Sequence, residues 1–377
     1  MKIVMVSLVL NIHEAGVADS LHELTHGDYR FIETAVIDEE SDKGGCNKQF
    51  AARPYLVRVS NGQTVENALT LVREADVVLF GAAPVLYLKE RLKTGKLTFM
   101  VSERWLKRGM INILSPRLLK KLVVNHVYGR NKPYYALCAS AYASGDFAKM
   151  LTFKDKCFKW GYFTFVPTID IVSVQGAKRA STVKILWVAR FLQLKHPERM
   201  LQLASQLRGS NVNFSIDMIG DGPEYDKIAS EVKKQGLENY VHLLGKMPNG
   251  KVMEAMRSHH IFCFTSDKNE GWGAVLNEAM SSGCCPVSSI ATGSTPYLIK
   301  DGINGFSFDL NEENDLFDKI LWLIKHPEEC EKMSIAAYNT MKNVWSPQNA
   351  ANQLYRLSEA LLNDKEWGLE EGPCSKA

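Results

Sequence analysis

The stretch EGWGAVLNEAM occupies residues 270–280 and joins a glycine-containing turn to the start of a predicted helix. The apolar run before it, residues 261–265, is typical of a buried parallel strand. Two glycines let the backbone approach a ligand closely, and the free N–H groups at the start of a helix attract anions. The order of strand, turn and helix therefore predicts an α/β unit with an anion site at a strand end, and a nucleotide diphosphate suits that site.

Two acidic residues flank this turn. Glu270 precedes the predicted helix and Glu278 lies about one turn inside it; helical side chains lean toward the N-terminus, so both should lie at the mouth of the site. A carboxylate among apolar neighbours needs partners, and two ribose hydroxyls would suit Glu278. The alternative is that Glu270 caps the helix and Glu278 faces solvent, and spacing alone leaves both readings open.

A second group of charged residues follows another predicted strand, at 184–189. Arg190 and Lys195 come at its carboxyl end, where two cations can hold a diphosphate and offset the charge that develops on it as it leaves. The alternative is a pair of solvated loop cations. We favour the diphosphate because the turn at 271–273 is expected at the same sheet edge.

The whole chain alternates short apolar strands with helical stretches, which predicts parallel sheets covered by helices. Its 377 residues exceed the usual size of one core, so we expect two doubly wound Rossmann-like domains facing across a ligand-binding cleft. The polar stretch 171–181 is the expected linker. The predicted strands are 2–9, 29–36, 77–80, 97–101, 135–138 and 163–165, then 184–189, 213–219, 241–244, 261–265 and 285–288.

Composition excludes several classes of protein. The net charge of +3 does not indicate a nucleic-acid partner, and no apolar run reaches the length of a membrane span. Residues 2–9 are interpreted as a buried strand rather than a signal sequence. The eight cysteines form no CxxC pair, which favours buried thiols in a reducing, cytoplasmic compartment.

Residues 89–132 concentrate positive charge, with twelve Lys and Arg against two Glu, a net +10. Apolar residues interleave with the cations, as in basic amphipathic surfaces that bind anionic lipid at the inner membrane face. The alternative is a solvated basic face over a core-packed helix. No nucleic-acid-binding module accompanies the charge, so nucleic acid is not expected.

Taken in order, these motifs resemble a known family. The second half of the chain looks like the donor-binding half of family 4 glycosyltransferases, which have the GT-B fold. The motifs that carry this resemblance are, in order, Arg190 and Lys195, GDGP at 220–223, the strand at 241–245, Glu270 and Glu278, Gly283 and the turn at 302–305. More loosely, NIHE at 11–14, FGAAP at 80–84 and VSER at 101–104 resemble bacterial surface-polysaccharide members. Neither glycine-containing segment fits G-x-G-x-x-G, which argues against a dinucleotide enzyme.

The resemblance implies transfer of a sugar from a nucleotide-diphosphate sugar to a glycan or lipid-linked acceptor, with retention of anomeric configuration, without a metal and without a further cofactor. It implies that Arg190 and Lys195 hold the diphosphate, Glu278 the ribose and Glu270 the sugar hydroxyls. Backbone groups would come from Gly271, Trp272, Gly273 and Ala274, and contacts to the base from Lys246 and Met247.

The resemblance also implies roles for the first domain. Glu103, which ends a strand, is a candidate acceptor-side and catalytic residue, and a salt bridge to Arg104 or Lys107 is the alternative. His13 is a second acceptor-side candidate, or a solvated loop residue. Family members often carry paired glycines in the first loop, whereas this loop offers Gly16 alone for phosphate contact.

The expected domains are therefore residues 1–175 on the acceptor side and residues 182–345 on the nucleotide-sugar side. Residues 346–377 are expected to form a helix at 348–363, which crosses back to the first domain, followed by a frayed tail. Other GT-B activities, such as a nucleotide-sugar epimerase or a sugar phosphorylase, would need side chains that the sequence does not clearly offer. A non-catalytic scaffold remains the alternative from another class, and the intact Arg190, Lys195, Glu270 and Glu278 argue against it.

Overall fold

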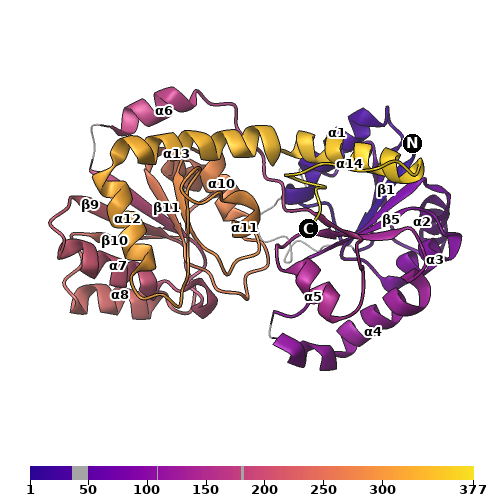
Figure 1. The fold of residues 1–377 in the computed structure, drawn as a ribbon, viewed down its shortest axis with the longest axis horizontal. Helices are drawn as coiled ribbons and strands as arrows, with labels where there is room; N and C mark the ends of the chain where they lie inside the picture. The colour runs from indigo at the N-terminus through magenta and orange to yellow at the C-terminus, as the bar shows by residue number, and fades with distance from the viewer. Residues whose placement is uncertain (36–49, 108, 180–181) are drawn as a thin grey trace. The chain divides into compact units, whose positions relative to one another are not determined.

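The computed structural model describes residues 1–35, 50–107, 109–179 and 182–377. These divide into two compact units, the first made of residues 1–165 and 345–377 and the second of residues 166–344 (Figure 1). Each unit contains one parallel sheet, so the predicted α/β class with two Rossmann-like domains is confirmed.

The sheet of the first unit has the strand order β3-β2-β1-β4-β5-β6-β7, with every neighbouring pair parallel. The order reverses between β1 and β4, and ligands of open α/β sheets bind at such a point, beyond the carboxyl ends of the strands. The strands are β1 (Ile3–Ser7), β2 (Tyr29–Glu33), β3 (Leu56–Arg58), β4 (Val77–Phe80), β5 (Thr98–Ser102), β6 (Tyr134–Cys138) and β7 (Cys157–Lys159).

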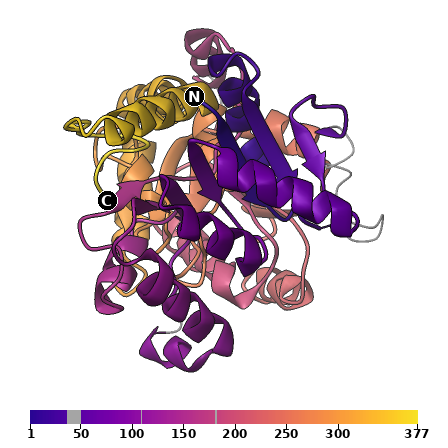
Figure 2. The same ribbon diagram turned by 90° about the vertical axis from the view of Figure 1, so that its right-hand side faces the viewer.

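Helices connect these strands (Figure 2). They are α1 (Ile12–Leu24), α2 (Gly62–Glu74), α3 (Val85–Thr94), η2 (Gly109–Leu114), α4 (Pro116–Val124), η3 (Asn125–Gly129), α5 (Ala143–Lys149) and α14 (Pro347–Leu362). Helix α14 packs beside α1, although more than 300 residues separate them in sequence (Figure 1).

The sheet of the second unit has the order β10-β9-β8-β11-β12-β13 and reverses between β8 and β11. Its strands are β8 (Val183–Val188), β9 (Phe214–Ile219), β10 (Val241–Gly245), β11 (Ile261–Phe264), β12 (Cys285–Ser289) and β13 (Phe306–Phe308). Its helices are α6 (Ile171–Lys178), η4 (Gln193–Lys195), α7 (Glu198–Arg208), α8 (Tyr225–Lys234), α9 (Asn249–Ser258), α10 (Val275–Ser281), α11 (Thr295–Leu298), α12 (Asp315–Lys325), α13 (Pro327–Asn339) and η5 (Thr340–Val344).

Two predicted elements are wrong. Residues 163–165 form no strand. The last strand of the first sheet, β7, lies a few residues earlier, and the sequence analysis missed it because three residues are too few to show an alternating pattern. The predicted linker 171–181 is largely a helix, α6, which packs on α13 of the second unit. Buried Gln175 and Lys178 both donate to the carbonyl oxygen of Gly283 (2.7 Å each), which explains why this polar segment is folded.

The predicted fraying of the C-terminal tail is also wrong. Beyond α14 the chain returns to the edge strand β7, where the backbone N–H of Lys159 donates to the carbonyl of Ser375 (2.7 Å). The N–H of Cys374 donates to the carbonyl of Lys159 (2.8 Å), and Lys376 forms an antiparallel bridge with Phe158. The tail therefore extends the first sheet, a long-range pairing that local sequence does not reveal.

Burial of the cysteines agrees with the sequence. Seven of the eight lie in the described ranges, and all seven are buried and free; Cys46 lies outside those ranges. Within the residues that the structure describes, no helix is both long and apolar enough to cross a bilayer.

Arg91, counted above in the basic segment, is an interior residue with no exposed surface. Its guanidinium donates to the carbonyl oxygens of Val72, Ala75, Asp76 and Leu97 at 2.7–3.0 Å and to the hydroxyl of Thr98 at 3.2 Å. Burial lowers its pKa to about 10, so it stays charged at neutral pH. One side chain thus satisfies carbonyl groups at the end of α2 and at the starts of β4 and β5.

Arg91→Leu should destabilise the first unit by more than about 3 kcal/mol, because four carbonyls around the buried guanidinium lose a charged donor. Chemical denaturation monitored by circular dichroism measures the loss. Lys93→Met, at an exposed position of the same helix, is the matched control and should change the free energy of unfolding by less than about 1 kcal/mol. Equal stability of the two variants would contradict the interior role of Arg91.

Candidate functional site

The carboxyl edge of the second sheet gathers the residues that the sequence singled out. Because β8 and β11 are neighbours, the loops that follow them flank the point where the strand order reverses. Arg190 lies two residues beyond β8, Lys195 ends the short helix η4, and Glu270 lies in the loop between β11 and α10.

Backbone hydrogen bonds join the loops of this edge to one another. The N–H of Gly220 after β9 donates to the carbonyl of Gly245 in β10 (2.9 Å), and the N–H of Phe191 donates to the carbonyl of Asp221 (2.7 Å). The N–H of Asp267 in turn donates to the carbonyl of Leu194 (2.9 Å). Four successive strand ends are therefore fixed relative to one another.

Side chains reinforce the contact between the β8 and β11 loops. The buried indole N–H of Trp187 donates to the hydroxyl of Thr265 (2.8 Å), which donates to the carbonyl of Lys195 (2.6 Å). His196 lies 2.8 Å from a carboxylate oxygen of Glu198 and 3.4 Å from one of Asp267, and these carboxylates, with Glu198 first, raise its pKa. The sequence analysis did not identify these residues, since only the fold brings them together.

Lys195 and Glu270 form an ion pair through Nζ and Oε2. Both side chains are only about one-sixth exposed, at 16% and 17%. Lys195 also lies over the ring of Phe264, 5.8 Å from its centroid. The residues predicted to bind the diphosphate and the transferred sugar are thus direct neighbours.

Arg190 differs from Lys195 in its surroundings. Its side chain is exposed, and within the described part of the chain it has no ion-pair or hydrogen-bond partner. An exposed guanidinium without a protein partner can bind an anion without first breaking a protein contact.

The turn at 271–273 depends on its glycine and its tryptophan. Gly273 has φ +87°, and a Cβ there would lie 2.2 Å from the ring of Phe264, so other residues are excluded. The Trp272 side chain is 1% exposed, and its indole N–H donates to Asn277 Oδ1 (2.9 Å). Trp272 therefore anchors the turn from inside, and this segment can offer a ligand its backbone only.

Glu278 lies in α10, as predicted, and is partly buried. Burial raises the pKa of this carboxyl to about 7. Among the described residues no side chain or backbone group donates a hydrogen bond to it. A desolvated acid without a donor can accept hydrogen bonds from a ligand.

The predicted base contacts lie further along the same edge. Lys246 and Met247 follow β10, the first strand of the sheet, and Lys246 is exposed while Met247 is partly buried. Their role stays a prediction.

The two acceptor-side candidates of the first unit are linked by Tyr162, which the sequence analysis missed. The Tyr162 hydroxyl donates to Glu103 Oε1 (2.6 Å), and Lys107 Nζ pairs with Glu103 Oε2 (2.6 Å). His13 stacks on the Tyr162 ring at 5.5 Å, and burial lowers the His13 pKa. The salt bridge from Glu103 to Lys107 is therefore present, whereas Arg104 pairs with Asp146 instead.

The prediction that Gly16 lies in the first loop is wrong. Gly16 is in the second turn of α1, where a Cβ would lie 2.9 Å from the ring of Pro347, so its small size allows α14 to pack closely. Glu14, in the first turn of α1, is a further partly buried acid; desolvation raises its pKa to about 8, and Asn11 Nδ2 donates to its carboxylate (2.6 Å).

Comparison with known proteins agrees with this geometry. The family model described as "Glycosyl transferases group 1" matches residues 170–340, all inside the second unit. The chain is similar to the uncharacterized glycosyltransferase MJ1178 of Methanocaldococcus jannaschii, with 35% identity over 118 residues, 31% of this chain and 33% of that protein. It is also similar to N-acetyl-alpha-D-glucosaminyl L-malate synthase of Bacillus anthracis, with 25% identity over 184 residues, 49% and 47% of the two chains.

The matched segments thus span a third to about half of these curated relatives. Among solved structures, Anabaena HepE in complex with UDP is similar over 96% of this chain and 100% of that one, with a TM-score of 0.70 and 15% identity. This likeness shows that the fold is GT-B.

Glu278→Gln should stabilise the second unit at pH 8 but not at pH 4.5. Because the folded-state pKa of Glu278 is raised to about 7, ionising it costs the folded protein up to about 3 kcal/mol, a cost that is complete above pH 7 and vanishes toward pH 4.5. Chemical denaturation at several pH values measures the difference between variant and wild type.

Glu313→Gln, at an exposed position, is the control and should change stability by less than about 0.5 kcal/mol at every pH. A stability difference for Glu278→Gln that does not vary with pH would refute the assignment of the titration to this residue.

Proposed function

We propose that this chain, which belongs to the group 1 glycosyltransferases through residues 170–340 and has the GT-B fold, transfers a sugar from a nucleotide-diphosphate sugar to a glycan or lipid-linked acceptor. One observation carries the proposal: the loops that bear Arg190 and the Lys195–Glu270 pair follow β8 and β11, between which the strand order of the second sheet reverses, and Glu278 lies on α10, the helix after the β11 loop. That arrangement provides cations for a diphosphate and acids for hydroxyl groups on either side of it.

The two cations are assigned to the diphosphate. Helix α10 has only seven residues, so its dipole is a minor source of positive charge, and Arg190 and Lys195 supply most of it. As the nucleoside diphosphate leaves, negative charge grows on its terminal phosphate, and the nearby cations stabilise that charge more than they stabilise the ground state. This is the role that allows transfer without a metal ion.

The acids are assigned to the sugars. Glu278 accepts hydrogen bonds from the ribose hydroxyls, which replace the water that burial removes from its carboxylate. Glu270 keeps Oε2 on Lys195 and has Oε1 for a hydroxyl of the transferred sugar. The Lys195–Glu270 pair thereby couples the diphosphate position to the sugar position, and transfer with retention is the expected outcome.

UDP is the first nucleotide to test, since the similar Anabaena structure contains it. UDP should raise the melting temperature of the wild-type protein, because a ligand of the folded state stabilises it. Calorimetry should show at least about tenfold weaker UDP binding for Arg190→Ala and for Lys195→Gln, the loss expected from one charge-assisted contact.

Lys233→Gln, on the exposed face of α8, is the control and should bind UDP as the wild type does. The proposed function fails if UDP, GDP and ADP all leave the melting temperature unchanged. Retention is checked separately by NMR of the anomeric proton of the product.

The membrane part of the proposal rests on a surface of the first unit that we call the η2–α4 surface, residues 109–127. It exposes large apolar side chains beside exposed Lys120 and Lys121: Met110, Ile111, Leu114, Leu119, Val123 and Val127. Such a surface fits an anionic bilayer, where the apolar groups enter the interface and the cations meet lipid headgroups. Cytoplasmic, membrane-peripheral synthesis of a surface polysaccharide follows from this assignment.

The double variant Ile111→Asp with Leu114→Asp should bind vesicles containing phosphatidylglycerol more than about tenfold less than the wild type, because two apolar side chains (69% and 76% exposed) no longer enter the interface. Co-sedimentation measures the bound fraction. Leu151→Asp, which changes an 86% exposed residue after α5, is the matched control. Binding by the double variant equal to that of the control would remove the membrane assignment.

A further inference from the structure

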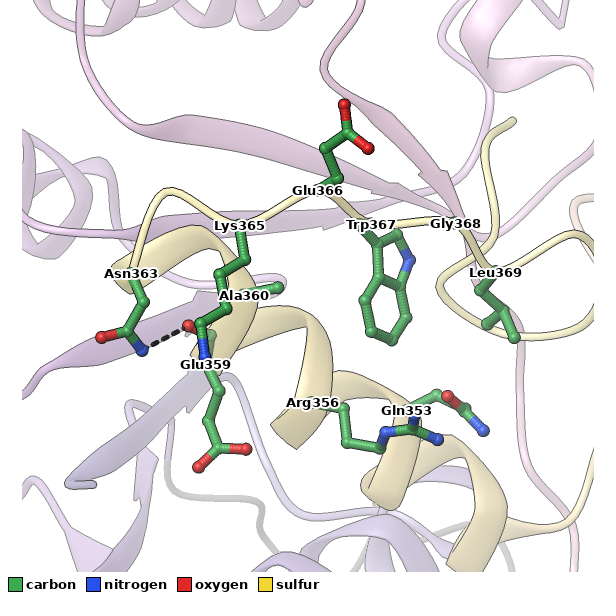
Figure 3. A pocket seen from close by; sticks show the side chains of 10 residues that line it. All are labelled: Gln353, Arg356, Glu359, Ala360, Asn363, Lys365, Glu366, Trp367, Gly368 and Leu369. Atoms are coloured by element: carbon green, nitrogen blue, oxygen red, sulfur yellow. Dashed lines mark hydrogen bonds between the residues drawn. The ribbon is translucent and has the colours of Figure 1, made fainter.

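The returning C-terminal tail creates a groove in the first unit. It has a volume of about 600 Å³ and lies between the last turns of α14 and residues 363–369 (Figure 3). This volume is within the range of small-ligand pockets. No residue of the groove belongs to the donor-site loops of the second unit or to the Glu103 and His13 cluster.

The groove is held open by the attachment of the tail at both of its ends. Asn363 ends α14 and donates from Nδ2 to the carbonyl of Glu359 (2.7 Å). At the other end, backbone pairing fixes Cys374 and Ser375 to Lys159. Between these points the N–H of Lys365 donates to the carbonyl of Ala360 in α14 (2.9 Å), and residues 365–369 line the groove together with α14.

Trp367 is the dominant side chain of this groove. Its indole N–H donates to the carbonyl of Cys374 (2.8 Å), so the polar edge of the ring is satisfied by protein. Figure 3 shows the ring pointing from the tail toward Arg356 and Gln353 on α14, and the residue is only partly buried. A fixed indole that lines an open groove offers its apolar face to a ligand.

The surrounding side chains are polar and carry balanced charge. Its polar lining consists of two bases, two acids and two amides: Arg356, Lys365, Glu359, Glu366, Gln353 and Asn363. Their net charge is zero, which does not favour a phosphate or a nucleic acid. An aromatic face with amide, guanidinium and carboxylate groups around it suits a pyranose, whose C–H face stacks on the ring while its hydroxyls both donate and accept hydrogen bonds.

We propose that this groove is a carbohydrate-binding site, separate from the donor site, that holds an uncharged hexopyranose chain of the acceptor or the growing product. The proposal rests on the proposed glycosyltransferase function for the source of the chain, and on the groove alone for the binding. Trp367 supplies the stacking surface, and Gln353 and Arg356 bind the hydroxyl groups. Holding the chain here raises the effective concentration of its end near the enzyme.

Three soluble oligosaccharides serve as probes: maltohexaose, cellohexaose and chitohexaose. Saturation-transfer NMR on the full chain should show binding of at least one of them to the wild type. Trp367→Ala should weaken that binding at least about tenfold, a loss of 1.4 kcal/mol or more. Trp367→Phe keeps an aromatic face and should retain more affinity than Trp367→Ala.

Gln353→Ala and Arg356→Ala test the same groove without touching the tail's hydrogen bonds, and each should weaken binding measurably while the melting temperature is unchanged. UDP binding, measured in parallel, should be equal in all these variants. Absence of binding by all three probes, or binding that none of the variants weakens, overturns the carbohydrate site. If the wild type binds none of UDP, GDP and ADP, the proposed function fails, and the groove result stands by itself.

Discussion

Close backbone packing between the β8 loop and the β9 turn holds the candidate donor site in place. Gly220 has φ +143°, and a Cβ on it would lie 1.9 Å from the carbonyl oxygen of Ala189, so the two segments touch in a way that only glycine permits. The hydrogen bond from Phe191 to Asp221 closes the same contact. Arg190 lies between Ala189 and Phe191, the two residues that make these contacts. Its backbone position therefore depends on Gly220, thirty positions away in the sequence.

The same rigidity explains the electrostatics of the site. The β8 and β11 loops are joined through Thr265 and Asp267, so Lys195 and Glu270 meet as a partly buried ion pair. Glu278, on α10, is partly buried and has no such partner among the described residues, and desolvation of its carboxyl raises the pKa to about 7. A site with one acid paired and another unpaired is arranged for a ligand that brings hydroxyl groups and an anion together.

In the first unit, charge alone was a poor guide to location. The segment 89–132 carries a net +10, yet Arg91 is interior, Arg104 is paired with buried Asp146, and Lys107 is paired with Glu103. These three cations support the fold or a polar cluster, and the exposed cations next to the apolar residues of the η2–α4 surface are a smaller set. Composition counts charges, whereas burial decides which of them a partner can meet.

The sequence by itself determined the alternation of strands and helices, the strand ends after which Arg190, Lys195 and Glu270 lie, and the glycine turn that leads from Glu270 into the helix that bears Glu278. These follow from local periodicity and from residues close together in the chain, which act over a few residues at a time. It misplaced four features: the strand predicted at 163–165, the linker that is helix α6, the tail that pairs with β7, and Gly16, which packs on Pro347. Only the tertiary structure decided these features, together with the Tyr162 contacts and the Trp367 groove. Each of them depends on contacts between segments far apart in sequence, and a local sequence pattern carries no information about the free energy of such contacts.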